Sequence, residues 1–318
     1  MINKIYCLGT SCTAGGGFEF DCKYKHRGEI GRLDITRGDY IKNIYTEHPQ
    51  TQNHYSYVGQ MEILLNSMGY DNIKFRNISK QGYGNERLYR KFFELTNEDN
   101  FKGPFGNSKK ETLFIFEFSD LSRKEFWFEP LQNHIVMNYK ADDSDLKSMT
   151  VAKSYWYDGV HERNTIKEHM DVIRKFREEF IVTDNQSIEI TRNFILFLDF
   201  LKQQKFNFLI SAMPETLHPN YYNQIDRYKD NIIQFGFDDD KKYESFNIFA
   251  DENKLTIRDE TFGAYGDLHP SLYANKLVSK MVYNKMVMNN LIKGKKISLP
   301  KPKSFVEEFK KNTKSILI

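Results

Sequence analysis

The sequence predicts an α/β protein with a largely parallel sheet, because apolar runs of strand length alternate with segments of helical periodicity. The first apolar run leads directly into a glycine-rich loop, and the last helical segment begins just after a proline. A sheet built this way is covered by helices on both faces. Its functional site lies beyond the carboxyl ends of the strands.

Four segments are predicted as strands. Three of them are almost continuously apolar, as expected for buried strands, and one alternates apolar and polar residues. The continuous runs cover residues 4–8, 112–118 and 206–212, and the alternating run covers residues 72–78. Loops that follow the runs ending near residues 8, 78 and 118 therefore lie at one edge of the sheet, where they can share a site.

Helices are predicted between these strands. The first begins at Tyr57 and is stopped by Gly69, and the second covers residues 87–93. A third has an apolar face of residues spaced i, i+4, i+7, i+8 and i+11, starting at Ile190. The last begins after His269-Pro270, with proline at a first-turn position.

Residues 1–292 are predicted to form one domain, followed by a basic C-terminal tail over residues 293–318. Residues 120–185 are aromatic and charged without clear periodicity, and we interpret them as an insertion or lid within that domain. The last 28 residues contain eight Lys and two Glu, a net charge of +6, which leaves −3 for residues 1–290. A mildly acidic body gives no basis for a nucleic-acid partner.

The cysteines and the hydropathy pattern suggest a cytoplasmic protein. Three cysteines near the N-terminus do not make a disulfide framework and suit a reducing compartment. No segment reaches the roughly 20 apolar residues that a membrane span needs. The apolar stretch at the N-terminus is too short for a signal peptide. The sequence leaves the oligomeric state open.

The loop after the first strand, Gly9-Thr10-Ser11-Cys12-Thr13, provides a candidate nucleophile in Ser11. A serine hydroxyl is a weak nucleophile until a base takes its proton, so it needs an imidazole within hydrogen-bond reach. Cys12 is the alternative nucleophile in the same loop. The loop is not the Gly-x-Ser-x-Gly elbow of α/β-hydrolases, because Thr13 occupies the second glycine position.

His269 is the candidate base, and Asp267 is the candidate carboxylate that orients it. Residues i and i+2 of an extended segment point the same way, so Asp267 and His269 can contact each other. A histidine just before a helix and beside a carboxylate is well placed for general base catalysis. Glu260 is an alternative source of the carboxylate.

Three segments together resemble the conserved blocks of the SGNH (GDSL-type) hydrolases. Gly9-Thr10-Ser11-Cys12-Thr13-Ala14-Gly15 is similar to the first block, with Thr10 replacing Asp. Asn77-Ile78-Ser79-Lys80-Gln81-Gly82 is similar to the second block, and Asp267-Leu268-His269-Pro270 to the fifth. The resemblance covers most of the chain outside residues 120–185, and the blocks occur in the order typical of that family.

The resemblance implies a three-layer α/β/α sandwich with a flavodoxin-like sheet and an SGNH-like hydrolase domain over residues 1–292. It implies a serine esterase in which Ser11 attacks an acyl ester and His269 accepts its proton. Backbone N–H groups of Ser11 and Gly82 would bind the oxyanion. The family includes carbohydrate O-deacetylases, so an acylated glycan or small-molecule ester is the implied substrate, and neither a metal nor an organic cofactor is needed.

Two departures from the family pattern leave other functions open. Ser119 stands where the third block has an Asn that completes the oxyanion hole, and Ser119 or Asn85 would have to replace it. The aspartate is also two residues before the histidine rather than three. A catalytically inactive relative that binds glycans or has a structural role is therefore one alternative. An O-acyltransferase that uses the same serine is the other.

Overall fold

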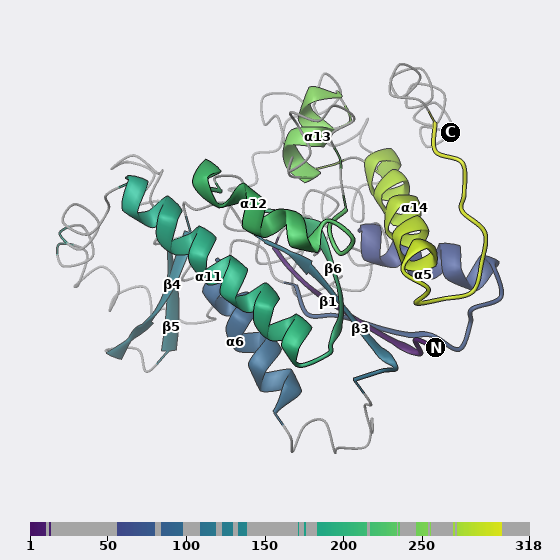
Figure 1. Cartoon of the computed structure of the whole chain (residues 1–318), viewed down its shortest axis with the longest axis horizontal. Coiled ribbons are helices and arrows are strands. Elements are labelled where there is room, and N and C mark those ends of the chain that lie inside the picture. Colours follow the sequence, from purple (N-terminus) through teal and green to yellow (C-terminus); the bar gives the residue numbers. More distant parts are fainter. Residues whose placement is uncertain are drawn as a thin grey trace, which may run out of the picture.

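The computed structural model shows a parallel sheet with helices packed on both of its faces (Figure 1). The residues that the structure describes are 1–10, 13, 56–79, 84–97, 109–118, 123–129, 133–138, 171, 175, 183–214, 217–233, 235, 246–253, 255, 270 and 272–300. Within these residues, no helix is both long enough and apolar enough to cross a membrane.

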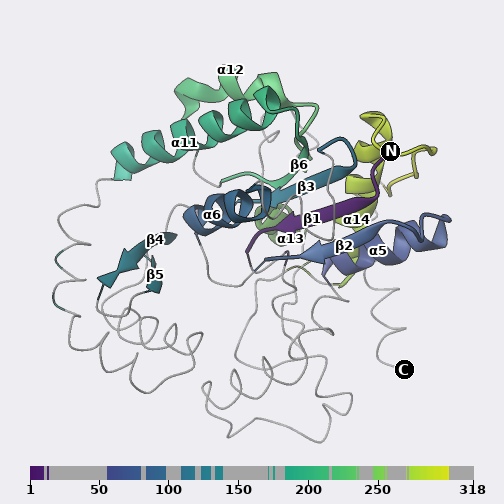
Figure 2. The ribbon, with the colours of Figure 1, turned by 90° about the horizontal axis from the view of Figure 1, so that it is seen from below.

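Four parallel strands form the central sheet in the order β2-β1-β3-β6, side by side in Figure 2. Their bounds are β1 (Lys4–Leu8), β2 (Lys74–Asn77), β3 (Thr112–Glu117) and β6 (Asn207–Ala212). Beyond β6, Ile232 forms a further parallel bridge to Ile210. Each strand lies within a segment that the sequence predicts as a strand, and the α/β fold class is confirmed.

One face of the sheet packs against α5 (Tyr57–Ser67), α13 (Phe246–Glu252) and α14 (Leu272–Met288). Because side chains alternate along a strand, Ile5 and Leu113 point to this face while their chain neighbours point away. Ser56 caps the N-terminus of α5, and its side chain accepts a hydrogen bond from the Gly59 N–H at 3.3 Å. Helices α5 and α14 also contact each other.

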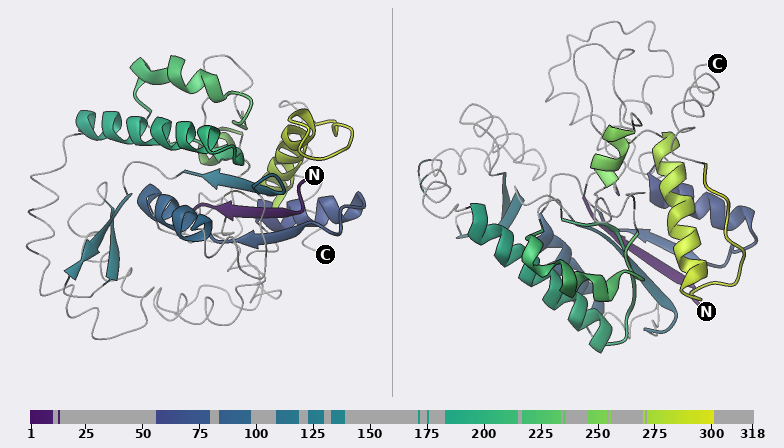
Figure 3. Two further views of the ribbon diagram at one scale, coloured as in Figure 1. Left: turned by 60° about the horizontal axis from the view of Figure 1, so that its bottom comes forward. Right: turned by 45° about the horizontal axis from the view of Figure 1, so that its top comes forward.

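The opposite face packs against α6 (Asn85–Thr96), α11 (Thr183–Gln203) and α12 (Tyr222–Ile225). Short 3₁₀ turns, η3 (Pro219–Tyr221) and η4 (Asp226–Tyr228), flank α12. Phe92 of α6 is fully buried, and its ring lies 5.0 Å from that of Phe114 and 5.2 Å from that of Phe197. Figure 3 shows α11 and α14 on opposite sides of the strands.

A separate two-stranded antiparallel sheet is formed by β4 (Arg123–Phe128) and β5 (Asn133–Asn138), and β4 contacts α6. The sequence did not predict these strands, because the segment from residue 120 onward shows no sustained strand periodicity. They lie near the start of the predicted insertion over residues 120–185. Of residues 139–182, the structure describes only 171 and 175.

The chain after α14 turns back along that helix. The Asn284 side chain donates to the Ile297 carbonyl at 2.8 Å and accepts from the Ile297 N–H at 2.7 Å. Ile297 and Leu299 also pack against the core on the α5 and α14 side. The first part of the predicted basic tail, up to Pro300, therefore lies against the domain, and residues 301–318 lie outside the described residues.

Candidate functional site

The carboxyl ends of the four strands meet at one edge of the sheet, because all four strands are parallel. The chain passes from β1 to β2 on one side and then to β3 on the other, so the order of the strands reverses between β1 and β3. Ligands of open α/β sheets bind outside the carboxyl ends at such a reversal. Gly9 and Thr10 follow β1 at this position, directly before Ser11 in the sequence.

Glu117, the last residue of β3, is buried at this edge with 3% of its surface exposed. Its carboxylate accepts a hydrogen bond from the Thr10 hydroxyl at 2.5 Å and a longer one from the Thr10 N–H at 3.3 Å. It also accepts from the Thr13 N–H at 2.6 Å and from the Thr13 hydroxyl. One carboxylate thus binds the residue before Ser11 and the residue two positions after it.

Thr13 makes a second set of contacts with hydroxyl groups on the α5 side of the sheet. Its Oγ1 lies 3.1 Å from the Tyr57 hydroxyl, which lies 2.9 Å from Ser211 Oγ. The register between β3 and β6 shifts at Phe116 and Glu117, and Ser211 lies opposite that shift. Burial raises the pKa of Tyr57 well above its ordinary value, and the nearby Cys7 and Glu117 raise it further.

The end of β2 is joined to the same loop through Asn77. Its side-chain amide donates to the Thr13 carbonyl at 2.7 Å, and its Oδ1 accepts from the Ser79 N–H at 3.1 Å. The Ile78 N–H donates to the Cys7 carbonyl at 2.8 Å. The segment with second-block similarity therefore begins in direct contact with the loop after β1.

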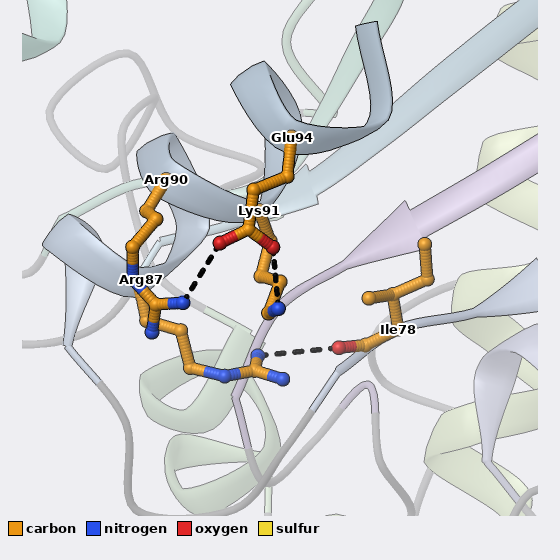
Figure 4. Close-up of polar contacts among 5 residues, drawn as sticks. All are labelled: Ile78, Arg87, Arg90, Lys91 and Glu94. Carbon is orange, nitrogen blue, oxygen red and sulfur yellow. Dashed lines mark hydrogen bonds and ion pairs between the residues drawn. The ribbon is translucent and has the colours of Figure 1, made fainter. Parts of the chain in front are cut away.

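Arg87, in the first turn of α6, contacts the chain just after β2. Figure 4 shows the Arg87 guanidinium donating to the Ile78 carbonyl, with a distance of 3.2 Å between Nη1 and the oxygen. Ile78 follows β2 directly, so this hydrogen bond joins the end of β2 to the start of α6. The other contacts in Figure 4 join Glu94 to Arg90 and Lys91 one turn earlier, and such pairs on a helix surface contribute little to stability.

Gly9 is required by the close approach of the Glu117 side chain. A Cβ atom at this position would lie 2.5 Å from Thr13 Oγ1 and 2.7 Å from Glu117 Cβ. Both distances are shorter than real contacts of a Cβ atom, and the second neighbour is the root of a buried side chain rather than its flexible end. The first glycine of the loop thus has a packing function that its place in the sequence pattern did not reveal.

The structure describes few of the residues that the sequence predicts for the site. Asn85 is buried at the first position of α6. Pro270, which follows His269, accepts a hydrogen bond from the Asn275 side chain of α14 at 3.1 Å. The predicted site residues that lie outside the described residues are Ser11, Gly82, Ser119, Asp267 and His269. The structure brings together the chain segments that flank the first of these, and it does not describe the others.

Sequence reasoning missed the buried network of Glu117, Thr13, Tyr57 and Ser211. One signal for it is present in the strand itself. The side chains of β3 that share a face are Leu113, Ile115 and Glu117, so an acid stands where the pattern calls for a third apolar residue. A buried charge at the carboxyl end of a central strand is a sign of a functional edge.

Two further observations bear on what this edge can bind. Within the residues that the structure describes, no three His, Cys, Asp or Glu side chains are grouped so that they could hold a metal ion.

Family models, curated proteins and solved structures were compared with the chain, and none matches it. At the switch point of the parallel sheet, the buried Glu117 carboxylate binds Thr10 and Thr13, the described residues on either side of Ser11.

Proposed function

We propose that the chain is a serine hydrolase of the SGNH (GDSL-type) class that cleaves an acyl ester. The observation that carries the proposal is the anchoring of Thr10 and Thr13, on either side of Ser11, by Glu117 at the switch point of the sheet. A nucleophilic turn at the end of the first strand must be held rigidly for its hydroxyl to meet a base and a carbonyl in line. The contact between Asn77 and Thr13, which joins the first and second blocks, adds support.

The proposed fold is the three-layer α/β/α sandwich with a flavodoxin-like sheet. It is supported by the strand order β2-β1-β3-β6 and by the helices on opposite faces of the sheet.

In the proposed mechanism, Ser11 is the nucleophile and His269 the general base, with Asp267 orienting the imidazole. The Ser11 oxygen bonds to the carbonyl carbon of the ester while its proton passes to His269. That proton then goes to the departing alcohol as the carbon–oxygen bond breaks, which leaves an acyl-enzyme. Water adds to the acyl carbon, gives a proton to His269, and the acid is released as Ser11 regains its proton.

Oxyanion stabilisation is proposed to come from the backbone N–H groups of Ser11 and Gly82, helped by Ser119 or Asn85. Each preorganised donor of this kind contributes about 10²–10³ in rate. The proposed substrate class is an acyl ester of a small molecule or of a glycan, and O-acetylated sugars are the first substrates to screen.

The experiment is covalent labelling with a fluorophosphonate probe, followed by peptide mass spectrometry to locate the adduct. We expect the wild-type chain to carry the adduct on Ser11, and both Ser11→Ala and His269→Ala to lose it while retaining the far-UV circular dichroism of the wild type. An adduct on Cys12 instead, or labelling that survives in His269→Ala, would contradict the assigned roles.

A second function has one observation in its favour. The third-block position of the oxyanion Asn is occupied by Ser119, which is consistent with an inactive relative that binds glycans or serves as a structural component. A folded wild-type chain that forms no adduct, yet binds acylated sugars in calorimetry, would establish it. An O-acyltransferase would form the adduct as well, so products are analysed with an alcohol acceptor present: free acid alone identifies hydrolysis.

A further inference from the structure

We propose that Glu117 is a positioning residue for the Ser11 nucleophile. By binding the residues on both sides of the serine, its carboxylate fixes the turn from which the hydroxyl reacts. The inference rests on the proposed function and adds to it a residue to which the comparison of blocks gives no role.

The buried Glu117 carboxylate depends on Thr10 and Thr13 for its hydrogen bonds. A carboxylate that is removed from water is strongly disfavoured unless hydrogen-bond donors replace the water. Among the described residues, the donors to Glu117 are the N–H and hydroxyl groups of Thr10 and Thr13. A movement of the turn would leave a buried charge without donors, so the acid holds the turn in one arrangement.

The two threonines restrict where the serine between them can lie. Thr10 is directly before Ser11, and Thr13 is two residues after it. Both are bound through the backbone N–H as well as the hydroxyl, so their main-chain positions are fixed and not only their side chains. Consecutive Cα atoms are about 3.8 Å apart, and a chain segment this short with both ends fixed has few conformations.

Glu117 itself belongs to a central strand of the sheet. It ends the β3 strand, which lies between β1 and β6 in the sheet. Thr13 is held in turn by Tyr57 of α5 and by Asn77 of β2, and Tyr57 contacts Ser211 of β6. Three elements, β3, α5 and β2, thus contact Thr13 directly, and β6 is joined to it through Tyr57.

A role in stability alone does not explain an acid at this place. An apolar side chain would continue the face formed by Leu113 and Ile115, whereas a buried carboxylate costs free energy unless donors replace its water. The acid is thus the costly choice, and what it supplies is a fixed turn. Every contact that the Glu117 carboxylate makes among the described residues comes from a donor on Thr10 or Thr13, so it acts through the residues beside Ser11.

The test compares Glu117→Gln, Thr13→Val and Thr13→Ser with a control, Thr191→Val. Thr191 is a buried threonine of α11 whose Oγ1 donates to the Ser187 carbonyl at 2.7 Å and accepts from the His218 N–H at 2.8 Å. The control therefore loses a comparable hydroxyl on the other face of the sheet. Measured for each are the rate of fluorophosphonate labelling at Ser11 per folded molecule, kcat and KM for an ester that the wild type hydrolyses, and the denaturant midpoint.

We expect Glu117→Gln and Thr13→Val to label about 10–100-fold more slowly per folded molecule, since a displacement of about 1 Å costs up to that much in rate. The loss should fall on kcat while KM stays within about twofold, because the binding groups of the substrate site are unchanged. Thr13→Ser keeps the hydroxyl and should recover most of the rate. Thr191→Val should shift the denaturant midpoint and label like the wild type.

The proposal is overturned if Glu117→Gln and Thr13→Val label as fast as the wild type per folded molecule, with only their denaturant midpoints lowered. If Glu117→Gln does not fold, the two Thr13 variants decide the matter by the same criterion. A wild-type chain that does not label at Ser11 overturns both the proposed function and this inference. The two failures are distinguishable, because the first is seen in the wild type and the second only in the variants.

Discussion

The two faces of the sheet differ most at its carboxyl edge. On the α6 and α11 face, the side chains remain apolar to the end, with Phe116 and then Phe118 following Phe114 along the chain. On the α5 and α14 face, the same strand passes from Leu113 and Ile115 to the buried acid Glu117. The strands are shared by both faces, so the difference comes from the alternation of side chains alone.

This comparison indicates which face serves the proposed site. The aromatic face can be explained by burial, because each ring removes a large apolar area from water. The polar edge of the other face cannot be explained in this way, because Glu117, Ser211 and the Tyr57 hydroxyl must each find a hydrogen-bond partner. Both faces bury an apolar core, so we expect the proposed positioning to depend on the Glu117 edge alone, and variants on each face should separate it from stability.

The largest effect on stability is expected from Phe92→Ala on the aromatic face. Phe92 is fully buried among the rings of Phe114, Phe197 and Phe206, and truncation of such a residue costs about 3–5 kcal/mol. The free energy of unfolding is measured in urea, and labelling at Ser11 is measured where the variant is folded. We expect labelling per folded molecule to equal that of the wild type. A tenfold loss would contradict the expectation that the aromatic face affects stability but not labelling at Ser11.

Gly9→Ala should affect both stability and labelling. The added methyl group meets Thr13 Oγ1 and Glu117 Cβ, and forcing extra atoms into a packed site costs about 1–3 kcal/mol. Because these are the groups that hold the turn, labelling per folded molecule should fall by about 10-fold or more.

The matched control for Gly9→Ala is Gly69→Ala. Gly69 has a φ of +83° and nothing within 4 Å of a Cβ at its position, so the substitution strains the backbone without touching the site. It should cost about 1–2 kcal/mol and leave labelling unchanged. Equal labelling in the two variants would contradict the role that we give to Gly9.

Tyr57→Phe should lower stability by about 1–2 kcal/mol at pH 7, because it leaves the buried Thr13 and Ser211 hydroxyls without a common partner. It should also change the response to alkali. Burial raises the pKa of Tyr57 in the folded state, so its contribution to stability is complete below the unfolded pKa of about 10 and is lost above it.

The free energy of unfolding is therefore measured from pH 8 to pH 12 for the wild type and Tyr57→Phe. The wild type should lose stability above pH 10, and the variant should lose it less steeply. Tyr228→Phe on the other face is measured in the same way for comparison. The pKa of Tyr228 is also raised, to about 12, by burial and by the hydrogen bond to Asp199. A Tyr57→Phe curve as steep as the wild-type curve would show that the hydroxyl is not buried as described.

The smallest effect is expected from a thiol reagent on native Cys7, which lies on the same face as Ile5 and is fully buried. Burial, with a further contribution from Glu62, raises the pKa of its thiol. Iodoacetamide at pH 8 should leave Cys7 unmodified in the native chain and alkylate it in guanidinium, as measured by peptide mass spectrometry. Modification of native Cys7 at the rate of the unfolded chain would contradict its burial.

The strands and the main helices could be predicted from the sequence because their signals are local. Apolar runs such as Thr112–Glu117 and the periodic face of α11 depend on residues a few positions apart. The antiparallel strands β4 and β5 were not predicted, because they lack clear alternation of apolar and polar residues. Which helices cover each face of the sheet depends on contacts between distant segments, which no local pattern contains.

The buried network could not be predicted because its members are far apart in the sequence. Thr13 and Glu117 are separated by 104 residues, and Tyr57 and Ser211 by 154. Glu117 interrupts the apolar face of β3, but nothing in the local sequence links it to Thr13, Tyr57 or Ser211. The sequence did predict that the loop after β1 and the end of β2 share an edge, and the contact between Asn77 and Thr13 agrees with that expectation.

The most direct test of the account is labelling of the wild-type chain by a fluorophosphonate probe across a urea titration, with the adduct located at each concentration. We predict an adduct on Ser11 in the native chain that is lost in the same transition as the folded structure, since the fold rather than the local sequence activates the serine. An absence of any adduct in the native chain would contradict the account. So would an adduct that forms equally well in the unfolded chain.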